Sequence, residues 1–157
     1  MSRYYFAYGS NMNPDRMRAR NMAFSHYEWG VLEGYQLMFN KRSVIVEGHA
    51  AANVVMAYDA EVEGVLYHLD DESGIQKMDP FEGYPKGYTR EPLPVQTRSG
   101  EYDAWVYQAT PEYIVHDRKP ARWYLEHLLS ASHLLSETYA RLLTQIECLP
   151  DSHEEPR

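Results

Sequence analysis

Residues 4–12, Tyr-Tyr-Phe-Ala-Tyr-Gly-Ser-Asn-Met, change from mainly aromatic to mainly small or polar residues after Tyr8. Four of the first five residues are aromatic and favour a β-strand, and Gly9-Ser10-Asn11 ends it. Asn13 suits a helix N-cap and Pro14 the first helical position, so a short helix is predicted to about Arg20. A strand-to-helix loop of this kind can direct successive backbone N–H groups at an anion or oxyanion. A plain β-to-α turn uses the same residue types, and this alternative stays open.

The segments that follow alternate mainly between strands and tight turns. Alternating apolar positions predict strands over residues 31–40, 51–58, 61–69, 88–97 and 102–109. Asp59-Ala60 is interpreted as a hairpin turn. A single short helix is predicted from Asp70 or Asp71 to about Met78, because the next pair is Asp79-Pro80 and the residue before a proline avoids the helical region. Pro92 and Pro94 predict an edge or a bulge in their strand.

The C-terminal part changes to a helical period. Apolar residues from Tyr124 to Ile146 follow helical spacing, and Pro150 is expected to end that helix. Strands and short helices come first and helices last. This order predicts an α+β fold with a mostly antiparallel sheet, and leaves open whether the sheet closes into a barrel. One domain is expected over residues 1–150, followed by a frayed, disordered tail over residues 151–157.

The composition excludes several classes of protein. The formal net charge of −8 over 157 residues argues against nucleic-acid binding, and 44% hydrophobic residues argue against wholesale disorder. No apolar run approaches the ~18 residues of a membrane span. The single cysteine and the lack of a visible export signal predict a cytoplasmic protein. The 14 tyrosines indicate an aromatic-lined cavity or interface, since a buried ring must still place its hydroxyl.

A second unusual segment, Pro-Phe-Glu-Gly-Tyr-Pro-Lys-Gly-Tyr, covers residues 80–88. Glu82 lies between Phe81 and Tyr84, in a stretch whose glycines and prolines restrain the backbone. Aromatic surroundings disfavour the charged carboxylate and raise its pKa, which suits a general acid/base near neutrality. A solvated loop glutamate is the alternative.

Other kinds of site have little support in the sequence. The seven histidines form neither HxH nor HExxH, so no metal site is predicted, and no glycine-rich phosphate loop is present. Cys148 is interpreted as a small hydrophobic residue at a helix end rather than a nucleophile. Ser10 lacks the flanking glycines of a nucleophile elbow.

Together, Tyr-Phe-Ala-Tyr-Gly-Ser-Asn-Met at residues 5–12 and Glu-Gly-x-Pro-x-x-Tyr at residues 82–88 resemble the γ-glutamylcyclotransferase family. The resemblance is strongest from Tyr5 to about Ala109. It implies a small barrel with flanking helices and a cavity at one end. It also implies a catalytic acid/base at Glu82 and a set of substrate-binding residues, which are Tyr8, Gly9, Ser10, Asn11 and Tyr88.

The reaction that the resemblance implies needs no cofactor and no metal. The α-amine of a γ-glutamyl amide attacks its own γ-carbonyl, closes 5-oxoproline and expels an amine or amino acid. Glu82 would take the ammonium proton and return a proton to the leaving nitrogen. The backbone N–H groups of residues 9–11 would hold the oxyanion or the α-carboxylate. Gly9, without a side chain, can take a positive φ or let substrate approach the main chain.

Several points stay open at this stage. Removal of a γ-glutamyl group from a specialised biosynthetic amine or a γ-glutamylamine is an alternative function, and so is a non-catalytic module that binds a small molecule. Tyr88 follows Glu82 by one residue fewer than in some members of the family, which puts the role of Tyr88 in question. By the same resemblance, Asn40, at the end of its strand, aligns with a polar position of the family. The loop from Lys41 to Ala52 is expected at the cavity mouth, where Lys41 and Arg42 either meet an acidic leaving group or are simply solvated, and this choice stays open. The expected partner is a small γ-glutamyl substrate, with no nucleic acid and no membrane, and the chain is expected to be a monomer or homodimer.

Overall fold

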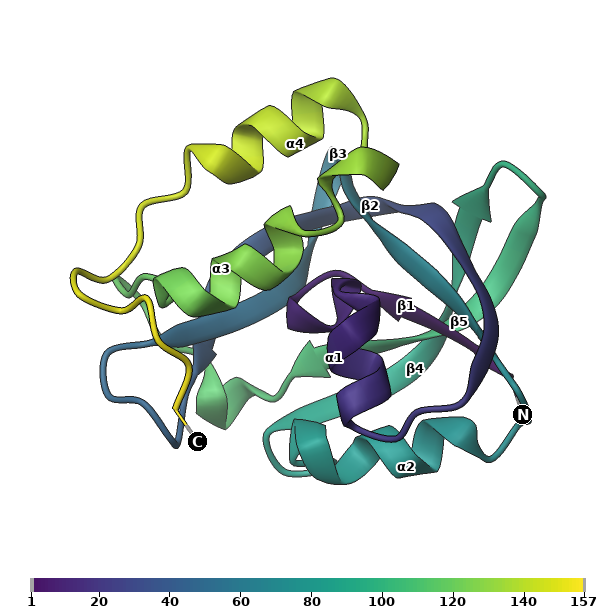
Figure 1. Ribbon diagram of the computed structural model, residues 1–157, viewed down its shortest axis with the longest axis horizontal. Helices are drawn as coiled ribbons and strands as arrows, with labels where there is room; N and C mark the ends of the chain where they lie inside the picture. The colour runs from purple at the N-terminus through teal and green to yellow at the C-terminus, as the bar shows by residue number, and fades with distance from the viewer. Residues whose placement is uncertain (1, 157) are drawn as a thin grey trace.

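Five strands form a closed barrel in the order β1-β3-β2-β4-β5 in the computed structural model, which describes residues 2–156 (Figure 1). The strands are β1 (Tyr4–Ala7), β2 (Phe24–Arg42), β3 (Ala50–Leu69), β4 (Tyr88–Thr97) and β5 (Glu101–Ala109). Neighbouring strands are antiparallel except β1 and β5, which pair in parallel through Tyr5 and Trp105. The predicted α+β fold with a mostly antiparallel barrel is therefore confirmed.

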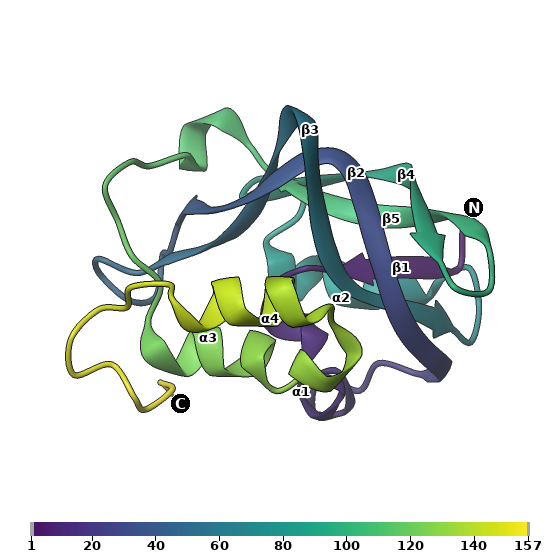
Figure 2. The same cartoon turned by 90° about the horizontal axis from the view of Figure 1, so that it is seen from above.

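The helices flank this barrel. They are α1 (Pro14–Ala19), α2 (Gly74–Glu82), α3 (Arg122–Leu129) and α4 (Glu137–Thr144), with the 3-10 turns η1 (Ser10–Met12), η2 (Pro111–Tyr113) and η3 (Ser132–Leu134). Figure 2 shows α1, α3 and α4 gathered on one side of the strands. The side chain of Asn13 accepts a hydrogen bond from the backbone N–H of Asp15 at 3.1 Å, so the predicted start of α1 is confirmed. Over residues 2–156, no helix is long and apolar enough to cross a membrane.

The long hairpin of β2 and β3 differs from the expected pattern. Strand β3 continues without a break through Asp59-Ala60, so the predicted turn there is wrong. The register between the two strands slips between Glu33 and Tyr35, where Gly34 has φ 83° and Asp59 has φ 59°. Aspartate tolerates left-handed backbone better than most residues, and a β-bulge uses this property as readily as a turn does.

Two helix boundaries were also predicted wrongly. Helix α2 passes through Pro80 and ends at Glu82, where Gly83 caps it with φ 64°. A proline in the last turn removes only one hydrogen bond of the helix, so it did not end the helix at Asp79. The C-terminal part is not one helix to Pro150 but α3 and α4 separated by η3, because Ser136 caps a new helix through a 3.2 Å hydrogen bond from the N–H of Tyr139.

The barrel interior is filled by side chains. Phe6 is fully buried, and Gly30 and Gly64, partners in the β2–β3 register, both face its ring. A Cβ atom on Gly64 would lie 2.3 Å from the carbonyl oxygen of Ala7, so only glycine permits this close approach of β1 and β3. Among the described residues, strand β4 pairs with β2 only at Gln96 and Thr97, and the stretch with Pro92 and Pro94 pairs with β5 alone, as predicted for an edge.

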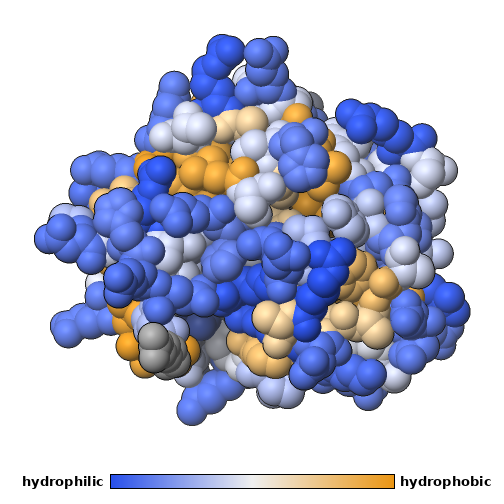
Figure 3. Space-filling view, viewed as in Figure 1, coloured by the Kyte–Doolittle hydropathy of each residue, from blue (hydrophilic) through white to orange (hydrophobic). Residues whose placement is uncertain are grey.

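The segment after α4 returns to the helical side of the barrel. The N–H of Trp123 donates to the carbonyl of Ser152 at 3.0 Å, and the N–H of Arg122 donates to its hydroxyl at 2.8 Å. Disorder of the tail stays a prediction, while Met1 and Arg157 lie outside the described residues. The surface on this side is largely hydrophilic, with separate apolar patches, one of them near α3 and α4 (Figure 3).

Candidate active site

A cavity of about 400 Å³ opens where β1 ends and α2 gives way to β4. Five tyrosines line it, as the tyrosine-rich composition predicted. They are Tyr5, Tyr8, Tyr88, Tyr107 and Tyr124. They come from β1, β4, β5 and α3, so segments far apart in the sequence converge on one space.

The structure brings all six sequence-predicted site residues to this cavity. These are Tyr8, Gly9, Ser10, Asn11, Glu82 and Tyr88. Much of the Lys41–Ala52 loop also lines it, at the expected place. Asn40 does not: its side chain is buried beside the cavity, and its Oδ1 has no hydrogen-bond partner among the described residues.

Glu82 is the last residue of α2, not a loop residue as the sequence suggested, and its side chain is half-buried. Its Oε1 accepts a hydrogen bond from Nδ2 of Asn11 at 3.2 Å. Arg20 donates to Oδ1 of Asn11 at 3.0 Å, which fixes the amide so that its NH₂ group faces the glutamate. The Gly-Ser-Asn turn and the glutamate of the second motif are therefore in direct contact.

Burial raises the pKa of Glu82 above its ordinary value. The positive charges of Arg20, Lys41 and Arg16 oppose this effect, and the charge of Asp79 adds to it. The net result is a carboxyl group whose protonated and ionised forms are closer in free energy near neutral pH than those of a solvated glutamate. This property suits a group that must both accept and donate a proton.

Gly9 is required by space rather than by backbone angle. Its φ is −118°, which other residues adopt, so the suggested positive φ is wrong. A Cβ atom there would lie 2.7 Å from the hydroxyl of Tyr124 and 3.3 Å from Cβ of Ala52. The same hydroxyl accepts a 3.0 Å hydrogen bond from the N–H of Ala52, and burial raises the pKa of Tyr124 to about 12. Tyr124 therefore stays protonated and packs directly against the glycine.

The other cavity tyrosines direct their hydroxyls at the framework. Tyr8 donates to the carbonyl of Tyr107 at 2.6 Å, and Tyr88 donates to the carbonyl of Ala52 at 2.7 Å. Tyr107 donates to Oδ1 of Asp79 at 2.6 Å. Burial raises the pKa of both Tyr8 and Tyr88 well above the ordinary value. Tyr88 is therefore held in place and uncharged, and its role in the motif is to form part of the cavity wall.

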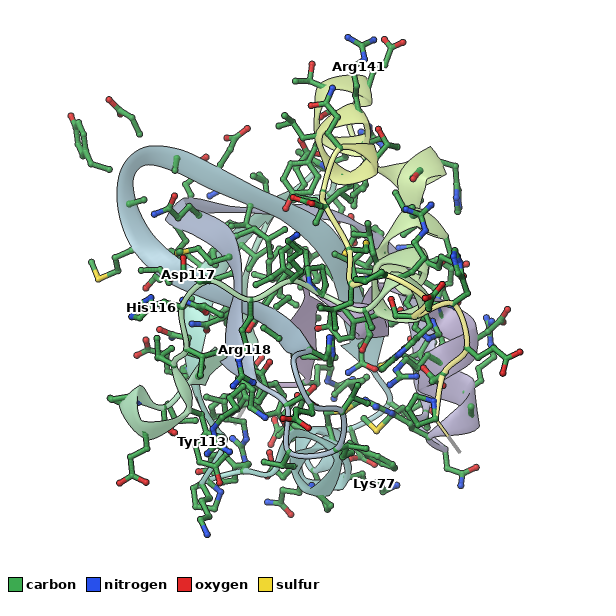
Figure 4. All side chains as sticks on the ribbon, turned by 90° about the vertical axis from the view of Figure 1, so that its left-hand side faces the viewer. Lys77, Tyr113, His116, Asp117, Arg118 and Arg141 are labelled. Carbon is green, nitrogen blue, oxygen red and sulfur yellow. The ribbon has the colours of Figure 1, made fainter. Side chains whose placement is uncertain are left out.

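Sequence reasoning did not single out the cavity residues Arg16 and Arg20, whereas it named Lys41 and Arg42 as candidate contacts for an acidic leaving group. Of these two, Lys41 lines the cavity. Arg16 and Arg20 are four residues apart on or beside α1 and both line it. Their i, i+4 spacing would have placed them on one helix face together. Lys41 packs over the rings of Tyr88 and Tyr113, at 5.0 and 5.2 Å from their centroids. It forms no ion pair with a carboxylate among the described residues. Arg42 packs over Tyr113 from the same strand at 4.7 Å, on the side of the molecule shown in Figure 4.

His49 is a further cavity residue that the sequence did not single out. Its Nδ1 accepts a hydrogen bond from the N–H of Ala121 at 2.9 Å, so the ring proton of the neutral form is on Nε2. Burial, with a contribution from Lys41, lowers the pKa of His49 to about 4. The ring is neutral at physiological pH and is not positioned as a proton carrier there.

The C-terminal segment closes one side of the cavity. Oε1 of Glu155 lies 2.6 Å from Nη1 of Arg16 and 2.9 Å from Nε2 of His127. Pro156 is also part of the lining. The group of three metal-ligating side chains found among residues 2–156 lies outside this cavity, on β2 and β3.

Comparison with known proteins agrees with this fold. Residues 5–126 match the family model described as gamma-glutamyl cyclotransferase, AIG2-like. No curated protein matches the chain significantly. Among solved structures, one described as a gamma-glutamyl cyclotransferase has a TM-score of 0.82 and 24% identity, covering 98% of this chain and 93% of the other.

Two further structures are similar over most of their length. The human uncharacterized protein loc79017 has a TM-score of 0.81 and 25% identity, covering 94% of this chain and 89% of that protein. A yeast cyclotransferase described as specific to glutathione has a TM-score of 0.58 and 13% identity, with coverage of 94% and 89%. Because the family model matches residues 5–126, which are most of the chain and contain both motifs, the chain belongs to the γ-glutamyl cyclotransferase, AIG2-like family.

Proposed function

We propose that this protein is a γ-glutamylcyclotransferase, which converts a γ-glutamyl amide into 5-oxoproline and a free amine or amino acid. The observation that carries the proposal is the Glu82 carboxyl group. It is held by Asn11 at one end of a tyrosine-lined cavity, and burial raises its pKa. Family membership supports the same reaction class.

The proton balance of the reaction needs one group that acts twice. Ionised Glu82 takes a proton from the substrate's α-ammonium, and the amine attacks the γ-carbonyl carbon to form a five-membered ring. Protonated Glu82 then gives the proton to the leaving nitrogen as the C–N bond of the tetrahedral intermediate breaks. The ring nitrogen still carries two protons after the attack, and it loses the second one to Glu82, from which the released amine takes it up to become an ammonium ion. No net proton is consumed at the carboxyl group, so a single glutamate is sufficient.

The cavity supplies the geometry and the charge that this reaction needs. Both reacting groups belong to one molecule, so confining the glutamyl chain in about 400 Å³ promotes the folded conformation in which they meet. Lys41 lines the cavity, forms no ion pair with a carboxylate among the described residues, and is the cation we assign to a substrate carboxylate. The turn that begins at Ser10 presents N–H groups without acceptors in their own turn, and these are the donors proposed for the γ-oxyanion.

The test is a panel of γ-glutamyl compounds, scored for 5-oxoproline release after exhaustive dialysis against a chelator. The panel contains γ-glutamyl amino acids, glutathione, γ-glutamyl-lysine and simple γ-glutamylamines. We expect release from at least one member, no requirement for a divalent ion, and loss of release in Glu82→Gln. Binding of γ-glutamyl compounds without any release would instead support a binding module. Activity that returned only on adding a metal ion would contradict the mechanism.

A further inference from the structure

A cluster of three potential metal ligands lies on the outer face of the barrel. His26 and Glu28 belong to the first residues of β2, and His68 is near the end of β3. His26 and His68 are register partners, and Glu28 is two residues beyond His26, so all three side chains emerge on the same face of the sheet. None of them lines the tyrosine-rich cavity. The register also pairs His68 with Tyr4, which places the cluster near the start of β1, beside the N-terminus in Figure 1.

The three side chains are close enough to share one ion. Nε2 of His68 lies 2.8 Å from Oε2 of Glu28, and Nε2 of His26 lies 3.6 Å from the same oxygen. One ligand atom from each residue lies within 4.8 Å of the other two. Ligands on a tetrahedral zinc ion at bond lengths of about 2.0–2.1 Å are about 3.3 Å apart. Side-chain rotation alone can therefore bring the three ligand atoms from their present separations to those of a tetrahedral site.

Neighbouring side chains hold two of the three ligands in place. The hydroxyl of Ser99, in the β4–β5 turn, lies 2.9 and 3.0 Å from the two carboxylate oxygens of Glu28. The hydroxyl of Tyr102 lies 2.9 Å from the hydroxyl of Ser99. The ring of His68 is flanked edge-on by Tyr4 and Tyr102, with centroid distances of 5.1 and 5.2 Å. Partners of this kind orient the ligands of metal sites. His26 remains 59% exposed, so an ion can enter from solvent.

We propose that His26, Glu28 and His68 bind a divalent transition-metal ion of the zinc type. Two imidazoles and one carboxylate suit zinc, nickel or copper, whereas calcium and magnesium require more oxygen ligands. Water completes the coordination on the exposed side. The ion joins β2 to β3 directly and the β4–β5 turn through Ser99, so its role is to stabilise this part of the barrel. The site is independent of the proposed cyclotransferase reaction.

The test is calorimetric titration of zinc into the full chain, stripped of metal and free of added histidines. We expect binding of one ion per chain, a rise in melting temperature with zinc, and no such rise with calcium or magnesium. Since His26 is exposed, His26→Asn is expected to fold normally and to lose more than the tenfold or so of affinity that loss of an outer-shell partner alone costs. Ser99→Ala is expected to weaken binding by a smaller factor, on the order of tenfold.

His116→Asn is the matched control, because His116 is an exposed histidine on the segment after η2, far along the chain from the cluster (Figure 4). It is expected to bind zinc like the parent protein. Absence of stoichiometric binding in the parent, or parent-like binding by both His26→Asn and His68→Asn, would overturn the proposal. Loss of binding in His116→Asn alone would overturn it as well.

Discussion

Glu63 and Glu82 are both glutamates withdrawn from solvent, but their surroundings differ. Glu63, on β3, is 5% exposed and accepts three hydrogen bonds. The donors are Nε1 of Trp29 at 2.9 Å, the N–H of Ser136 at 2.7 Å and the hydroxyl of Ser136 at 2.5 Å. Glu82 accepts one side-chain hydrogen bond, from Asn11, and its remaining surface faces the cavity.

The difference shows how burial alone fails to identify a reactive carboxylate. Donors on both oxygens of Glu63 use its acceptor capacity to join the β-barrel to the start of α4. Glu82 keeps capacity for a ligand, and the cavity provides the space. A buried carboxylate saturated with protein donors is a structural link, whereas an undersaturated one beside a cavity is a candidate catalyst.

The largest expected effect is on turnover in Glu82→Gln. Glutamine keeps the size and much of the hydrogen bonding but cannot accept the ammonium proton, so single-turnover release of 5-oxoproline should fall at least about a thousandfold. Calorimetric binding of 5-oxoproline or of an uncyclisable γ-glutamyl analogue should change little. Release within about tenfold of the parent would remove Glu82 from the mechanism.

The same variant also has a defined effect on stability. Because burial raises the pKa of Glu82 in the folded protein, its stabilising contribution is present below the unfolded-state pKa and is lost as pH rises through the folded-state value. Near neutral pH, Glu82→Gln should therefore be at least as stable as the parent in urea denaturation. A clear loss of stability would mean that the charge of Glu82 is structural, like that of Glu63.

The second effect is on stability in Glu63→Gln. The amide presents an NH₂ group to donors that need an acceptor, so unfolding free energy should fall by about 2–4 kcal/mol. Glu61→Gln, an exposed glutamate on the same strand, is the control and should change it by less than about 0.5 kcal/mol. Below its melting temperature, Glu63→Gln should keep parental kcat. A specific loss of kcat with normal stability would reverse the roles assigned to the two glutamates.

The third effect concerns the turn that presents Asn11 to Glu82. Gly9→Val should cripple turnover, and Gly9→Ala should lower it about tenfold to a hundredfold, because the new Cβ meets the Tyr124 hydroxyl 2.7 Å away. Tyr124→Phe removes that oxygen. Steady-state kinetics of Gly9→Ala in the Tyr124→Phe background should therefore recover part of the loss. Equal losses in both backgrounds would show that another contact requires the glycine.

The smallest expected effect is at Cys148. This half-buried thiol lies after α4, and its sulfur is 3.7 Å from the carbonyl oxygen of Ile146. Cys148→Ser should keep kcat within a few-fold of the parent, as should treatment with a thiol-alkylating reagent. Loss of turnover with the fold intact would show that Cys148 acts as a nucleophile, and would contradict the mechanism in which Glu82 is the catalytic group.

The sequence predicted what is local or carried by a motif. The strand Tyr88–Thr97 and the N-cap at Asn13 follow from residue preferences over a few positions. Residues 8–11 were assigned to the site through their motif. Glu82 was assigned to the site through its motif, although its helix was predicted to end before it. The local end signal that was overlooked is Gly83, which caps α2 in the left-handed conformation beyond Pro80.

The residues that sequence reasoning missed depend on register and on packing between distant elements. Tyr124 was assigned only to the core face of a helix, yet its hydroxyl reaches Ala52 across 72 positions of the chain. His26 and His68 become neighbours because β2 and β3 pair in one particular register. A search for histidines at helical spacing cannot detect a cluster that forms across two strands.

The parallel pairing of β1 with β5 has a consequence for the order of folding. The β2–β3 hairpin joins residues close in sequence, whereas Tyr5 and Trp105 meet only after most of the chain has been enclosed in a loop. Loop-closure entropy therefore delays this pairing relative to the hairpin. The cavity around Glu82 includes Tyr88 from β4 and Tyr107 from β5, so it is complete only after that late closure. Recovery of activity during refolding would then report the final step of barrel assembly, later than the secondary structure measured by circular dichroism.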